Sequence, residues 1–286
     1  MFKTLKTIFA LIISVSFLAN VSFGYESDIH QQLTFVAAKQ YSKCADLDAE
    51  LYQPSALDVR YLVRANVAQA DAGFFSRMFR WNYYNSSDLQ QRDVLGVIET
   101  RFQEHYRSLL RDIELGDRLE VRLKAVGRII SYLQDVTSPS KVVPVYTGRW
   151  WRFSFSDRFD RFPVDANAID ERLADSCEKT RSKLGDFESL LAKTAEKTIG
   201  AIKQDIKGYP ITWEAFWAFA EREGDFGEYG IAGNQFGKRS SFRCGDFEQC
   251  LLLEDDPIYQ EFALQRHLQA VEATMQALLI MQNYFE

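Results

Sequence analysis

Few side chains of this chain are suited to metal or acid–base chemistry, and they lie far apart in the sequence. The only histidines are His30, His105 and His267. Asp135 ends an apolar segment one helical turn after Ser131, so both side chains are expected on one helix face. An aspartate in that position either caps a loop or belongs to a site. We find no Ser/His/Asp arrangement, phosphate-binding glycine loop or dinucleotide fingerprint beside it.

Apolar residues recur at helical spacing along most of the chain. The pattern predicts helices over residues 29–41, 56–67, 89–110, 119–133, 166–206, 213–222 and 258–285. It therefore indicates an all-α fold, a single multi-helix bundle domain over residues 25–286. The intervening segments 72–86, 139–165 and 224–250 are rich in aromatic residues or glycine, and loops of this length usually carry function.

The first 24 residues have the pattern of a secretory signal peptide. Lys3 and Lys6 precede an apolar run, and small residues follow up to Gly24, which predicts Tyr25 as the mature N-terminus. No later stretch is long and apolar enough for a transmembrane segment. We expect export to the periplasm or the exterior.

An even number of cysteines in an exported chain predicts two disulfides. We expect Cys244 to pair with Cys250 across a small loop, and Cys44 to pair with Cys177 between distant helices. The spacing of these cysteines matches no zinc motif.

The charge balance and two aromatic segments bear on partners. With 34 basic against 40 acidic residues and no polybasic tract, a role in packaging nucleic acid is disfavoured, although a nuclease is not. Residues 149–153 and 74–81 interleave arginine with Trp and Phe. Such segments either bind bases or lipid headgroups, or pack on the bundle through their rings with the arginines outward.

The residues around Asp135 resemble the zinc-dependent phospholipase C and S1/P1 nuclease family, whose central motif is His-x-x-x-Asp-x-x-x-x-x-His. Tyr25 and His30 have the spacing of that family's N-terminal zinc ligands, and weaker similarity covers residues 81–84, 156–160 and 226–230. The resemblance implies an all-α phosphodiester hydrolase with three zinc ions. It assigns Asp135 to the catalytic centre and implies metal ligands at Tyr25, His30, Asp71, Asp135 and Asp160.

Four histidine positions of that family carry other residues here. These degenerate ligand positions are Asn82, Ser131, Lys141 and Ser156. Because neutral imidazole supplies most ligands of a catalytic zinc site, three zinc centres are not expected. The remaining carboxylates need a cation, which Lys141, Arg128 or Arg158 could supply, or they hold a single residual divalent metal, zinc if the protein is active.

The sequence thus favours an exported, catalytically impaired protein that acts as a binding or accessory protein. A phospholipid or another phosphate-bearing molecule is the expected ligand. The alternative is a metal-dependent phosphodiester hydrolase, a phospholipase C or nuclease, that uses a residual site. A purely structural envelope protein is a third class that the sequence leaves open.

Overall fold

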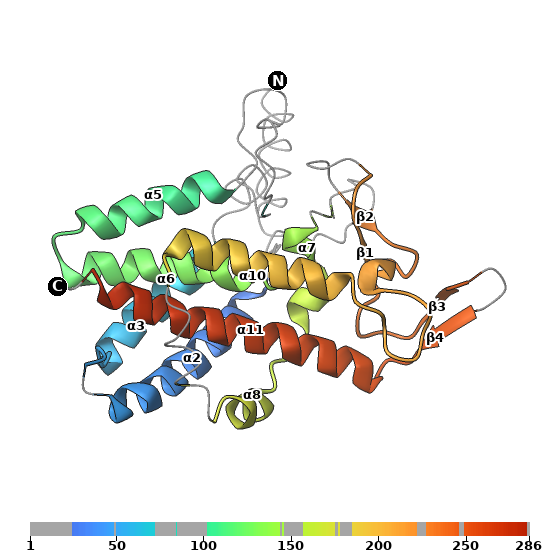
Figure 1. Cartoon of the computed structure of the whole chain (residues 1–286), viewed down its shortest axis with the longest axis horizontal. Helices are drawn as coiled ribbons and strands as arrows, with labels where there is room; N and C mark the ends of the chain where they lie inside the picture. The colour runs from blue at the N-terminus through green and yellow to red at the C-terminus, as the bar shows by residue number, and fades with distance from the viewer. Residues whose placement is uncertain are drawn as a thin grey trace, which may run out of the picture.

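The computed structural model describes residues 25–48, 50–71, 84, 102–143, 145, 157–174, 177, 185–221, 227–245 and 249–284 (Figure 1). This part of the chain is mostly helical, as predicted. The signal segment 1–24, Asn82, Ser156 and residues 149–153 lie outside it.

Most of the helices are long. Their bounds are α2 Ser27–Leu47, α3 Ala56–Ala70, α5 Phe102–Leu115, α6 Leu119–Asp135, α7 Pro139–Val142, α8 Ala166–Arg172, α10 Phe187–Ile202 and α11 Pro257–Gln282, with 3₁₀ turns at Phe159–Arg161 and Trp213–Ala215. Helices α3, α8, α10 and α11 begin with a side-chain cap. A reciprocal Ser55–Asp58 capping box begins α3, and Asp186 caps α10. Pro257 in the first turn of α11 loses no helical hydrogen bond there.

Helix α6 lies at the centre of the bundle and packs against α3, α5 and α11. Figure 1 shows α11 running beside α10, α6 and α2. Gly127 permits the close approach of α3 and α6, because a Cβ atom there would lie 2.4 Å from the Leu62 carbonyl oxygen. The contact brings the next turns of the two helices together, with Asn66 on α3 and Ser131 on α6.

Two small antiparallel ladders cap one end of the bundle (Figure 1). Strand β1 (Trp217–Ala218) pairs with β2 (Glu228–Tyr229), and β3 (Ser240–Arg243) pairs with β4 (Gln249–Leu252). The helix predicted over residues 213–222 is wrong. Its aromatic residues pack against Phe236 and Phe262 instead, and tertiary packing overrides the local pattern.

Two further boundaries differ from the prediction. In the described part of the helix expected over residues 166–206, α8 ends at Arg172 and Asp186 caps a new helix that begins at Phe187. Within the loop expected over residues 139–165, the structure forms α7 and a 3₁₀ turn, both of which carry residues of the candidate site. Of the helix expected over residues 89–110, the described part begins at Phe102.

Both predicted disulfides are confirmed. Cys44 pairs with Cys177 over a sequence separation of 133, and Cys244 pairs with Cys250 over a separation of 6. Among the described residues, no helix has the length and apolar character needed to cross a membrane.

Candidate functional site

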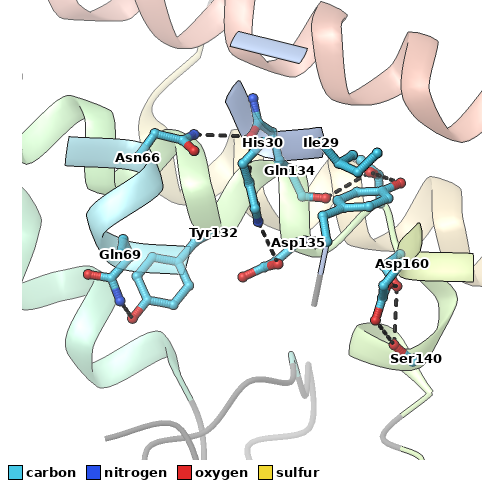
Figure 2. Close-up of polar contacts among 12 residues, drawn as sticks. Ile29, His30, Asn66, Gln69, Tyr132, Gln134, Asp135, Ser140 and Asp160 are labelled. Atoms are coloured by element: carbon cyan, nitrogen blue, oxygen red, sulfur yellow. Dashed lines mark hydrogen bonds and ion pairs between the residues drawn. The ribbon is translucent and has the colours of Figure 1, made fainter. Parts of the chain in front are cut away.

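A buried polar network joins the start of α2 to the end of α6. His30 lies in the second turn of α2 and is 1 % exposed. Its Nδ1 atom is 2.6 Å from Gln134 Oε1, and its Nε2 atom is 3.3 Å from Asp135 Oδ1. Figure 2 shows the imidazole between these two neighbouring side chains of α6. The sequence suggested His30 and Asp135, but it did not suggest Gln134.

The Gln134 amide has one possible orientation. Its Nε2 atom donates to the hydroxyls of Thr34 and Thr274, at 2.9 and 3.2 Å. Its Oε1 atom therefore accepts, from Asn66 Nδ2 at 3.0 Å and from His30 Nδ1. His30 must carry a proton on Nδ1. Its Nε2 atom then faces a carboxylate oxygen with a lone pair, unless a second proton or a cation lies between them.

Three polar atoms at this contact of α3 and α6 have no hydrogen-bond partner among the described residues. They are Asn66 Oδ1, Ser131 Oγ and Asp135 Oδ1, the last of which has only the His30 contact. Asn66 and Ser131 are 0 % and 1 % exposed. An unsatisfied buried polar atom is costly, so these three atoms are the least satisfied polar groups of α3 and α6 in the described part of the chain.

A second buried polar cluster surrounds Asp157 and Asp160. Ser138 Oγ donates to Asp160 Oδ1 at 2.5 Å, and Ser140 Oγ lies 3.4 Å from Asp160 Oδ2 (Figure 2). Asp157 Oδ2 accepts from the Trp217 indole at 2.8 Å and from the Tyr229 hydroxyl at 3.0 Å. These donors come from α7 and the two-stranded ladder, elements that were not predicted.

Lys141 is the cation of this cluster. It is 4 % exposed, and its charge lowers the pKa of both Asp157 and Asp160. Burial acts more strongly in the opposite direction and, with repulsion from Asp157, raises the pKa of Asp160 to about 7. Burial also raises the pKa of Asp157. One ammonium thus serves two buried carboxyl groups, and near neutral pH the cluster gains or loses a proton at Asp160.

Tyr25 connects the two clusters. Its hydroxyl donates to Thr137 Oγ1 at 3.2 Å, and its ring contacts the rings of His30, Phe159 and His267. The next residue, Glu26, donates its backbone N–H to the Asp160 carbonyl at 3.1 Å. The residue predicted as the mature N-terminus is therefore 1 % exposed and lies within the site.

The structure brings together four of the five metal ligands implied by the resemblance. Tyr25, His30, Asp135 and Asp160 lie near one another, and the charges of Asp135 and Asp160 both act on Tyr25. Asp71 is exposed and ends α3 as its C-cap residue.

Of the three cations proposed from the sequence, Lys141 is the one that lies beside the carboxylates. Arg128 is exposed, and the Arg158 Nε atom donates to the Phe236 carbonyl at 3.4 Å. Asp157 was missed, although its place one turn before Asp160 was a usable signal. Asn66, Thr34 and Thr274 gave no signal, because only tertiary packing brings them to His30.

The other two histidines have separate environments. His105 is partly buried, beside Ser108 and the Tyr132 ring. His267 lies in the core, and neither ring nitrogen has a hydrogen-bond partner among the described residues. Burial lowers the pKa of His267 to about 3, so it is neutral in the folded protein at neutral pH.

The residues present do not fit three zinc ions. Lys141 is buried at one expected ligand position, and its positive charge acts on Asp157 and Asp160, where a dication would need free carboxylates. Within the described ranges, no three His, Cys, Asp or Glu side chains gather as a metal-binding group. His30 Nε2 and Asp135 Oδ1, 3.3 Å apart, are the two implied ligands that approach each other directly.

Comparison with known proteins gave no match: no family model, no curated protein and no solved structure is significantly similar to the chain.

Proposed function

We propose that this chain is an exported binding or accessory protein, built on a helical scaffold of the phospholipase C/P1 nuclease type, that does not hydrolyse phosphodiesters. The proposal rests on one observation above the others: the buried Lys141 ammonium beside Asp157 and Asp160. Hydrolysis of this kind needs dications that activate water and neutralise the phosphate. An ammonium neutralises carboxylates but cannot generate a metal-bound hydroxide.

The surroundings of Lys141 support this role. Ser138 and Ser140, which follow α6 directly, give Asp160 two hydroxyl partners, and the Trp217 indole and the Tyr229 hydroxyl satisfy Asp157. A carboxylate with a full set of protein donors has little remaining capacity to ligate a metal ion. The second cluster therefore favours a structural ion pair over a hydrolytic centre.

The proposed ligand is a phospholipid or another molecule that carries a phosphate group. The resemblance to phosphodiester hydrolases and the arginine–aromatic segments 74–81 and 149–153 support this ligand class. The scaffold would keep a substrate-binding role after the loss of turnover.

A metal-dependent phosphodiester hydrolase is the second candidate. The specific observation that favours it is the 3.3 Å approach of His30 Nε2 to Asp135 Oδ1, because two ligands of one metal ion have a similar separation. This candidate requires that a single ion supports turnover, and turnover separates it from the binding protein.

The test uses the mature protein with both disulfides intact. We expect no hydrolysis of bis(p-nitrophenyl) phosphate with zinc or manganese, and sedimentation with phosphatidylcholine vesicles that contain phosphatidylglycerol. Retention of two to three zinc ions after desalting, with turnover that a chelator abolishes, would overturn the proposal. Failure to bind both the vesicles and a short oligonucleotide would contradict the proposal and favour a purely structural envelope protein.

A reversal variant tests the assignment of the degenerate ligand positions. Histidine is restored at all four, as Asn82→His, Ser131→His, Lys141→His and Ser156→His. If these positions descend from zinc ligands, the variant should retain more zinc than the natural protein. No gain of zinc would mean that the correspondence to the family motif is incorrect.

A further inference from the structure

We propose that Arg266, in the seam between α10 and α11, binds the phosphate group of the ligand through its Nε and Nη2 atoms. This inference rests on the proposed phosphate-bearing ligand, because it names the residue that holds the phosphate. The site uses none of the residues to which the zinc pattern assigns a metal.

The guanidinium of Arg266 is held in place by both helices of the seam, which lie side by side in Figure 1. Its Nη1 atom donates to Gln269 Oε1 at 2.5 Å and to the Lys197 carbonyl at 3.3 Å. Its Cζ atom lies 5.7 Å from the centre of the Phe262 ring, whose face attracts a cation. Lys197 belongs to α10, whereas Phe262 and Gln269 belong to α11.

The orientation of the Gln269 amide follows from its other contacts. Its Nε2 atom donates to the Thr194 carbonyl at 2.6 Å and lies 3.3 Å from Thr198 Oγ1. Its Oε1 atom must therefore accept, and Arg266 Nη1 is the donor. Because Gln269 is buried, this contact belongs to the packed seam and fixes the direction in which the guanidinium points.

The remaining edge of the guanidinium has no partner. Within the described ranges, Nε is buried without a hydrogen-bond acceptor, and both hydrogen bonds of Arg266 come from Nη1. The N–H groups of Nε and Nη2 lie in one plane and form a fork that can bind two oxygens of one phosphate or carboxylate. Arg266 is partly exposed, which gives an anion access to this side chain.

The charge of Arg266 is also uncompensated. No carboxylate in the part of the chain that the structure describes forms an ion pair with it, and Glu261, earlier on α11, pairs with Arg172 at 2.8 Å. The charge of Arg266 acts on the Tyr25 phenol, but burial raises the pKa of that phenol and keeps it neutral. Burial lowers the pKa of Arg266 to about 10, so the guanidinium remains charged at neutral pH. Since a buried charge is normally paired, a counter-ion from outside the chain is expected.

Thermal denaturation of the mature protein with increasing inorganic phosphate, at constant ionic strength, tests the site. An anion that binds the folded state raises the melting temperature. Arg266→Lys keeps the positive charge but loses the fork, so it should need about tenfold more phosphate, or a higher excess, for the same rise. Each protein is compared with itself in chloride, so a change in basal stability does not affect the result.

Arg122→Lys is the matched control. The Arg122 Nε atom already donates to the Gly116 carbonyl at 2.6 Å, so this variant should respond to phosphate as the natural protein does. The site is overturned if phosphate does not raise the melting temperature of the natural protein, or if Arg266→Lys responds as the control does. A larger rise with acetate than with phosphate would overturn the choice of phosphate as the ligand group.

Vesicles of phosphatidylcholine with phosphatidylglycerol distinguish the two sources of the phosphate group. Reduced sedimentation of Arg266→Lys would assign the fork to a lipid headgroup, whereas unchanged sedimentation with a lost phosphate response would assign it to a soluble phosphate. Equal sedimentation of both proteins without any phosphate response would overturn this site and leave the proposed function intact. A phosphate response without vesicle binding would contradict the lipid ligand and leave the site intact.

Discussion

Replacement of Lys141 by methionine should strongly destabilise the protein, and more so at alkaline than at acid pH. Methionine retains an unbranched apolar chain but removes the ammonium beside Asp157 and Asp160. Loss of one partner of a buried ion pair typically costs about 3–5 kcal/mol, because the other charge remains buried without compensation. At about pH 8 Asp160, whose pKa is about 7, has lost its proton in the natural protein, so the larger cost is expected there.

At about pH 5 the cost should fall to about 1–2 kcal/mol. Asp160, whose pKa is about 7, carries a proton at that pH, so one negative charge is already neutralised. Without Lys141 the pKa of Asp160 rises further, and the variant retains that proton over a wider range. Asp157 still accepts hydrogen bonds from Trp217 and Tyr229. The difference between the two pH values is the signature of the buried cation.

Urea unfolding followed by far-ultraviolet circular dichroism at both pH values measures the effect. Lys124→Met is the matched control, because Lys124 forms an exposed pair with Glu120 one turn away on α6. Such exposed pairs contribute little to stability, because solvent screens the two charges. If Lys141→Met costs no more than this control, or costs the same at both pH values, Lys141 is not the cation of the carboxylate cluster.

Three further changes have defined outcomes. Asp160→Asn should remove a pH dependence of the free energy of unfolding. Because the pKa of Asp160 is raised to about 7, the folded state binds a proton that the unfolded state lacks between about pH 4 and 7. The stability of the natural protein should therefore fall as the pH rises through this window, and that of the variant should not. His267→Phe should stabilise the protein against acid. Because the pKa of His267 is lowered to about 3, the unfolded natural protein binds an extra proton below about pH 6.5 that the folded protein does not bind. Urea unfolding at pH 4 should therefore show a free energy of unfolding up to about 3 kcal/mol higher in the variant. Replacing Cys44 and Cys177 by alanine should cost about 5 kcal/mol by loop entropy, against about 2 kcal/mol for the hairpin disulfide, as measured by urea unfolding.

The long helices and the cysteine pairing could be predicted because their signals are local. Helical spacing identifies α2, α3, α6 and α11, and an even number of cysteines in an exported chain indicates disulfides. The segment around Trp213 could not be predicted in this way. Trp213, Phe216 and Trp217 recur at helical spacing, but the rings of Phe216 and Trp217 pack against Phe236, which lies in a later loop. Contacts between residues far apart in the sequence cannot be recognised from the residues of one segment alone.

The candidate site, like the fold, could be predicted only where its residues carry a local signal. His30, Asp135 and Asp160 were suggested by spacing and resemblance, and they prove to be neighbours in the fold. Their partners come from elements whose relative positions the sequence does not contain: Asn66 from α3, and Trp217 from the ladder. A polar residue in an amphipathic helix looks the same in the sequence whether it faces solvent or the core.

Gln134 shows why those partners decide what the site can do. Thr34 and Thr274 fix the orientation of the Gln134 amide, so Gln134 Oε1 accepts a hydrogen bond from His30 Nδ1. The other ring nitrogen, Nε2, faces Asp135. The Asp157 carboxyl group accepts hydrogen bonds from Trp217 and Tyr229 and therefore has protein partners that leave no need for a ligand. Where the atoms remain partnerless, at Ser131 and Asn66, the same core has unused binding capacity. The two clusters therefore differ in chemistry, although Ser138 and Lys141 of the second cluster follow soon after α6, which carries Gln134 and Asp135 of the first.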